Sequence, residues 1–128
     1  MADAATRGTS RVIEAYGAGG FRVDGESFRG SVIVLPDGVV AWDASEIAAV
    51  TLDSLQPVVA AAREVEILLI GSGERFALAT PALRGALQAQ GIAVDSMDTG
   101  AACRTYNVLR AEGRRVAAAL IAVGTAPG

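Results

Sequence analysis

The chain has 128 residues and a formal net charge of −3, with 11 arginines but no lysine and no histidine. Without histidine there is no Ser-His-Asp or Cys-His relay and no imidazole ligand for a metal, and without lysine there is no Schiff base and no P-loop lysine. Nucleic acid binding is also disfavoured, because it needs clustered cations and these arginines are scattered. We therefore expect no catalytic residues, no metal site and no cofactor.

The length fits one domain with its own hydrophobic core. We expect this domain to cover residues 10–123, with flexible ends at residues 1–9 and 124–128. A single cysteine, Cys103, cannot form an internal disulfide, and the first residues lack the apolar stretch of a secretory signal, which predicts a cytoplasmic protein. No apolar run approaches the roughly 20 residues that cross a bilayer. Direct membrane insertion is therefore not expected, and any membrane contact would be peripheral, at the inner membrane and through a partner.

Turn signals predict β-hairpins in the first half of the chain. The sequence Asp-Gly-Glu at residues 24–26 separates short strand-like runs at residues 21–23 and 27–28, and the Asp-Gly pair suits a turn with positive φ. The sequence Pro-Asp-Gly at residues 36–38 separates residues 31–35 from residues 39–42, because proline presets the turn and glycine takes its left-handed position. The edge strands of so small a sheet leave homodimerisation open.

Helix signals begin in the middle of the chain. Asp53 or Ser54 is a candidate N-cap for a helix that runs to about Arg63 and tolerates a proline in its first turn. Thr80 precedes a proline at the first position of a second helix, and Gly91 stands where a left-handed C-cap belongs.

Strands and helices then alternate to the end of the folded region. Asp98 or Thr99 can cap a third helix through Glu112, and apolar runs at residues 65–70, 92–94 and 116–121 indicate three strands. Such alternation predicts parallel pairing with right-handed crossovers. The expected fold class is α/β (α+β mixed): a single compact domain in which N-terminal antiparallel β-hairpins join a small βαβαβ unit in a mixed sheet.

Several stretches carry a family resemblance. They are a hairpin that ends in Trp42, the run VEILLIGSG at residues 65–73, and the segment from Thr80 to Ile121 that contains SMDTGAACRTYNVLRAEG. Together they resemble the domain of unknown function 498 family over roughly residues 12–121. The most specific stretch is residues 97–113, with its pattern of Thr99, Thr105, Asn107 and Glu112.

The resemblance implies a compact mixed α/β domain without established catalytic activity. Because the family includes the mitochondrial complex I assembly factor 3, it also implies a role in assembling respiratory complex I (NADH dehydrogenase). The implied partners are complex I subunits or assembly proteins. The chain shows no transit peptide, so we expect a bacterial protein.

Two glycine-containing turns form a candidate ligand crevice. They consist of Gly71, Ser72, Gly73, Asp98, Thr99 and Gly100. In open α/β sheets, ligands bind outside the carboxyl ends of the strands, and free backbone amides there can hold an anion. The alternatives are that the first turn only redirects the chain and that Asp98 or Thr99 only caps the helix. A carboxylate at Asp98 together with Glu74 would repel an anion.

The third helix carries a candidate partner surface. Arg104 and Asn107 lie three positions apart and share a face, which is either a solvated surface or a contact with a partner. Cys103 lies in the first turns, where the helix dipole can lower its pKa. The alternative for this cysteine is a small buried apolar residue. Trp42 either anchors the core or faces a partner.

Carboxylates near the hairpins do not have the spacing of a calcium loop. The family resemblance implies a non-catalytic interaction protein. The alternative is a small-molecule or anion-binding domain, or an enzyme, that uses the crevice.

Overall fold

Near the N-terminus the chain forms a small antiparallel sheet. The computed structural model describes residues 11–124, and it begins with β1 (Ile13–Gly17), β2 (Gly20–Val23) and β3 (Glu26–Arg29) in the order β1-β2-β3. The hairpin expected around residues 24–26 is present, with positive φ angles of 51° at Asp24 and 82° at Gly25. We call these three strands the N-terminal sheet.

The other five strands form a central mixed sheet. They are β4 (Val32–Leu35), β5 (Gly38–Ala41), β6 (Ile67–Gly71), β7 (Ala93–Met97) and β8 (Val116–Leu120), in the order β5-β4-β8-β6-β7. Strand β6 pairs in parallel with β7 and β8, whereas β4 pairs antiparallel with β5 and β8. The predicted junction of a hairpin with a parallel βαβαβ unit is confirmed.

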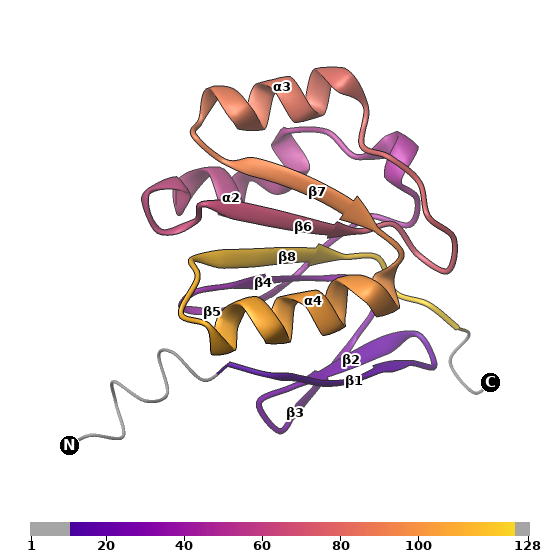
Figure 1. Ribbon diagram of the computed structural model, residues 1–128. Helices are drawn as coiled ribbons and strands as arrows, with labels where there is room; N and C mark the ends of the chain where they lie inside the picture. The colour runs from indigo at the N-terminus through magenta and orange to yellow at the C-terminus, as the bar shows by residue number, and fades with distance from the viewer. Residues whose placement is uncertain (1–10, 125–128) are drawn as a thin grey trace.

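Helices and the N-terminal sheet cover the two faces of the central sheet. Helix α3 (Pro81–Ala89) packs through Leu83 and Leu87 on one face, together with α2 (Gln56–Ala60). Helix α4 (Thr99–Ala111) and the N-terminal sheet pack on the other face through Tyr106 and Phe21, among other residues. Figure 1 shows α4 lying across the sheet with β1–β3 beside it. Both faces are covered, which explains why β4 and β8 are buried along their whole length.

The helix expected from Asp53 or Ser54 to about residue 63 is broken into short pieces. They are the 3₁₀ turn η2 (Asp53–Leu55), helix α2 and the 3₁₀ turn η3 (Ala62–Glu64), which follow an earlier 3₁₀ turn η1 (Ile47–Ala49). Helix α2 begins after Leu55, and neither Asp53 nor Ser54 caps it with its side chain. The Ser54 hydroxyl instead donates to the backbone oxygen of Thr51 at 2.8 Å. This local bond competes with the role of an N-cap.

The predicted flexible ends, residues 1–9 and 124–128, lie outside the described residues except for Gly124. Within residues 11–124, no helix combines the length and the hydrophobicity that crossing a bilayer requires.

Candidate functional site

The two predicted turns come together where β6 ends. Thr99 joins them, because its backbone N–H donates to the oxygen of Gly73 at 2.8 Å and its Oγ1 accepts from the Gly73 N–H at 3.0 Å. The same hydroxyl donates to the backbone oxygen of Ile121 at 2.7 Å. One buried hydroxyl therefore links the ends of β6 and β8 to the start of α4.

Close packing fills the space between these strand ends. Thr99 is completely buried. A Cβ atom at Gly71 would lie 2.9 Å from Thr99 Oγ1 and 3.0 Å from Leu120 Cδ2, closer than ordinary side chains approach. Glycine at position 71 thus serves the contact between the strand and the helix, and it leaves no room there for a ligand.

Backbone groups also bond the side chains of Ser72 and Asp98 in the two turns. The Ser72 hydroxyl donates to the oxygen of Arg75 at 2.7 Å and accepts from the N–H of Ala77 at 3.0 Å. The carboxylate of Asp98 accepts from the N–H of Ala101 at 2.9 Å and caps α4. Of the two alternatives for Asp98, the structure therefore shows the capping role.

A shallow hollow of about 220 Å³ remains beside these turns. Its lining includes Gly73, Glu74, Asp98 and Gly100, together with Tyr16 from β1. The ring of Tyr16 covers the start of α4 so closely that a Cβ at Gly100 would lie 2.9 Å from Tyr16 Cζ. Both charged residues of the lining are acidic, which disfavours the anion proposed for this place.

The two residues of the predicted partner surface have different surroundings. The amide of Asn107 pairs with β1, because its Oδ1 accepts from the N–H of Ile13 and its Nδ2 donates to the oxygen of Ile13, both at 2.9 Å. Arg104 is exposed and its Nη1 lies 3.4 Å from the hydroxyl of Tyr16. The partner surface therefore stays a prediction that rests on Arg104, with the exposed Val108 one turn further along α4.

The cysteine lies in the core. Cys103 is 3% exposed, and burial raises its pKa to about 12 despite the opposing effect of the Arg104 guanidinium. Its thiol is therefore protonated at neutral pH, as expected of a buried apolar residue. Trp42 is likewise buried, and its Nε1 lies 3.4 Å from the hydroxyl of Ser54.

Residues 11–124 hold no group of three or more metal-ligating side chains placed to bind a metal ion.

An exposed apolar loop that the sequence did not predict lies between β6 and α3. Phe76 is 61% exposed and Leu78 is 59% exposed. The alternate residues Ala77 and Ala79 pack against the core. Their N–H groups donate to Ser72 Oγ at 3.0 Å and to Ser96 Oγ at 3.2 Å. The alternation of large and small residues in Phe-Ala-Leu-Ala was the available signal.

Comparison with protein families and curated proteins gives consistent matches. A family model described as "Protein of unknown function (DUF498/DUF598)" matches residues 13–121. The chain is 34% identical to the NADH dehydrogenase (ubiquinone) 1 alpha subcomplex assembly factor 3 of Xenopus tropicalis, over 85% of this chain and 60% of that protein. It is 37% identical to an uncharacterised protein of Rhodobacter capsulatus, over 85% of this chain and 82% of that protein. The chain thus spans about 60% of the length of the assembly factor.

Solved structures share the fold. A crystal structure described as an outer membrane protein from Bartonella henselae has a TM-score of 0.83 and 42% identity, and the match covers 88% of this chain and 95% of that one. A solution structure from Bordetella pertussis, described as a Mth938-like domain, has a TM-score of 0.80 and 33% identity, with coverage of 92% and 89%. The architecture is that of Mth938-like domains.

Proposed function

Since this chain belongs to the family of proteins of unknown function DUF498/DUF598, we propose that it is a non-catalytic interaction protein that assists the assembly of respiratory complex I. Support comes from relatives in several animals that are named complex I assembly factor 3. The proposed partners are complex I subunits or other assembly proteins. We place the protein in the cytoplasm and, through its partner, at the inner membrane.

The observation that carries this proposal is the apolar pair Phe76 and Leu78. Both side chains are about 60% exposed on a loop whose backbone is fixed by Ser72 and Ser96. Ordered, outward-facing apolar side chains are typical anchors of protein interfaces. Burying the exposed parts of the two would contribute roughly 2–3 kcal/mol, which is about a 30- to 150-fold change in Kd.

The packing at the strand ends also favours an interaction protein over an enzyme. The crevice that a ligand would use is occupied by Thr99, and the hydroxyl of Ser72 bonds to its own loop. The proposal therefore places the functional surface outside that crevice.

Affinity capture tests the role. The chain, tagged at its C-terminus, is recovered from gently solubilised native cells, and the proteins that co-purify are identified by mass spectrometry. We expect stoichiometric recovery of NADH dehydrogenase subunits or assembly proteins. A chain recovered alone would contradict the proposal.

Variants of the apolar pair locate the surface. Phe76→Ser combined with Leu78→Ser should reduce capture more than tenfold while leaving the melting temperature nearly unchanged, because exposed side chains contribute little to stability. Val12→Ser is the matched control, since Val12 is 42% exposed elsewhere on the surface, and it should leave capture intact. Equal capture by the double variant and the control would exclude the loop as the contact.

The predicted surface on α4 is tested separately. Arg104→Glu reverses an exposed charge and removes the 3.4 Å contact with Tyr16, so the domain should stay folded. We expect weaker capture. Unchanged capture at unchanged thermal stability would remove Arg104 from the partner surface and leave the apolar pair as the proposed contact.

A further inference from the structure

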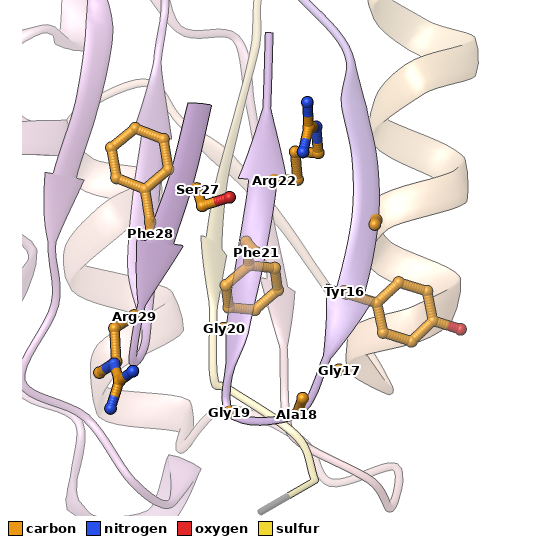
Figure 2. A pocket seen from close by; sticks show the side chains of 11 residues that line it. Tyr16, Gly17, Ala18, Gly19, Gly20, Phe21, Arg22, Ser27, Phe28 and Arg29 are labelled. Atoms are coloured by element: carbon orange, nitrogen blue, oxygen red, sulfur yellow. The ribbon is translucent and has the colours of Figure 1, made fainter. Parts of the chain in front are cut away.

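The N-terminal sheet carries a hollow in which every charged side chain is a guanidinium. The hollow has a volume of about 620 Å³ and is lined by residues 15–22 and 27–29 (Figure 2). These segments contain Arg22 and Arg29 but no carboxylate, in a chain whose net charge is −3. The lining residues therefore carry positive charge, although Arg22 is paired with the carboxylate of Glu14 outside the lining.

The register of the strands explains the shape of this hollow. Phe21 pairs with Phe28, and Phe21 points into the core. The intervening positions face the opposite side, where Arg22 pairs with Ser27 and Gly20 pairs with Arg29. Because most side chains on this outer face are small or absent, the two arginines stand on a floor of exposed backbone, one on β2 and the other on β3 (Figure 2).

The two arginines differ in how well they are neutralised. Arg22 Nε lies 3.4 Å from Glu14 Oε1, and that same carboxylate oxygen accepts from the N–H of Gly25. Arg29 is exposed, and among residues 11–124 it has no carboxylate or hydrogen-bond partner for its side chain. Its guanidinium can therefore form a bidentate contact with a carboxylate from outside the chain.

Strand β3 is an edge of this sheet and also borders the hollow. At the hairpin turn, Val23 of β2 pairs with Glu26 of β3. Just after β3, the N–H of Gly30 donates to the oxygen of Gly19 at 2.7 Å, which makes these two residues a hydrogen-bonded pair. In an antiparallel pair the residues between such bonded pairs turn their N–H and C=O groups away from the partner. For β3 these are Ser27 and Arg29, and no backbone group within residues 11–124 pairs with them on the outer side.

We propose that β3 and the hollow bind an extended acidic segment of a partner protein. The segment adds to the N-terminal sheet as a fourth strand, with its backbone bonded to Ser27 and Arg29. Its carboxylates lie on the outer face of the sheet. One of them contacts Arg29 on β3, and another reaches across Ser27 to Arg22 on the neighbouring strand β2. Backbone pairing gives affinity in this mode of recognition, and the two guanidinium groups select the charge. This surface is chemically distinct from the apolar pair Phe76 and Leu78 and does not depend on it.

A second copy of the chain fits this edge poorly. An antiparallel pair of β3 strands that bonds both Ser27 and Arg29 of each copy must be centred on Phe28. Arg29 of one copy would then be the diagonal neighbour of Arg29 of the other copy on the same face, and the two residues would lie about 7–8 Å apart. With Arg22 of both copies nearby, four guanidinium groups would share one surface, and of these only the two Arg22 side chains have a carboxylate partner, Glu14. An acidic partner removes this repulsion.

A synthetic peptide tests the inference. The probe is an eight-residue peptide of alternating glutamate and valine with blocked ends, titrated into the ¹⁵N-labelled chain. We expect saturable binding, with the largest amide shifts at Ser27 and Arg29. Arg29→Gln should weaken binding about fivefold, as expected for one exposed ion pair. Arg63→Gln, at another exposed arginine on η3, is the matched control and should have no effect.

Two further probes separate strand addition from simple anion binding. A peptide with N-methyl groups on the edge that faces β3 should lose binding, and a peptide with lysine in place of glutamate should not bind. The inference is overturned if no shifts appear at millimolar peptide, if the methylated peptide or free citrate binds equally well, or if Arg29→Gln behaves like the control. It is also overturned if sedimentation shows that the chain forms a dimer and that Arg29→Gln strengthens this dimer, because β3 would then bind a second copy of the chain.

Discussion

Removing the hydroxyl of Thr99 should be among the most damaging conservative changes in this protein. Thr99 is fully buried, its Oγ1 accepts from the N–H of Gly73 at 3.0 Å, and it donates to the oxygen of Ile121 at 2.7 Å. Thr99→Val keeps the shape of the side chain but leaves both backbone groups without this partner. Each unsatisfied buried group costs about 1–3 kcal/mol, so the loss should be about 3 kcal/mol in total.

This loss translates into a measurable melting temperature. For 128 residues the entropy of unfolding is about 0.27 kcal/mol/K, so a loss of about 3 kcal/mol lowers Tm by roughly 11 °C. Thermal and urea unfolding followed by circular dichroism measure both quantities. Thr99→Ser should recover most of the stability, because it keeps the hydroxyl.

A second threonine on the same helix provides the control. Thr105 is half-buried, and within the described chain its hydroxyl has no hydrogen-bond partner. Thr105→Val should therefore change Tm by only a degree or two. The reasoning fails if Thr99→Val melts within 2 °C of the unmodified protein, or if the two valine variants lose equal stability.

Four other outcomes follow from the packing. Asn107→Ala removes two 2.9 Å bonds to Ile13 and should cost about 1–2 kcal/mol, with faster hydrogen exchange at the Ile13 amide as its specific signature. Gly71→Ala would bring a Cβ within 3.0 Å of a neighbouring Cα and should cost about 1–3 kcal/mol in urea unfolding; unchanged stability would show that the contact relaxes freely. Because burial raises the pKa of Cys103 from 9.0 to about 12, a thiol reagent at pH 8 should label it only after unfolding. Burial also raises the pKa of Tyr106 from 10.0 to about 12. Because the unfolded chain loses these two protons at lower pH than the folded protein does, the free energy of unfolding should be highest below pH 9 and should fall as the pH rises toward 12. A free energy of unfolding that stays constant over that range would contradict both pKa shifts.

Local signals made the second half of the chain predictable. Thr80 caps α3 through the N–H of Leu83, and Asp98 caps α4. Both bonds join residues three apart, so the sequence alone carries the information. The parallel order of β6, β7 and β8 follows from strands that alternate with such helices.

Strand β1 was not predicted, because its alternation is interrupted. A bulge lies between Ile13 and Ala15, and the turn to β2 places the non-glycine Ala18 at a φ of 51°. A bulge shifts the side chains that follow to the other face, which hides the two-residue period. The separation of β1–β3 from the central sheet depends on which strands pair with one another, and no local sequence pattern carries that information.

The roles of the candidate site residues depend on contacts that are remote in sequence. Asn107 bonds Ile13 across 94 positions, and Thr99 bonds Ile121 across 22 positions. No local pattern distinguishes such an amide or hydroxyl from one that awaits a partner. The exposure of Phe76 and Leu78 could not be predicted, because large apolar side chains outside regular elements are buried as readily as they are exposed.

The attachment of the N-terminal sheet constrains the order in which the chain folds. The β1–β2 turn is bonded to the last described segment, since the Gly19 N–H donates to the oxygen of Val123 at 2.9 Å, and β1 is bonded to Asn107. Both partners leave the ribosome long after residues 13–29, at roughly 5–20 residues per second. During synthesis residues 13–29 are therefore made before their binding site on the domain, and the contacts that hold the sheet form only after residues 107–123 have been added.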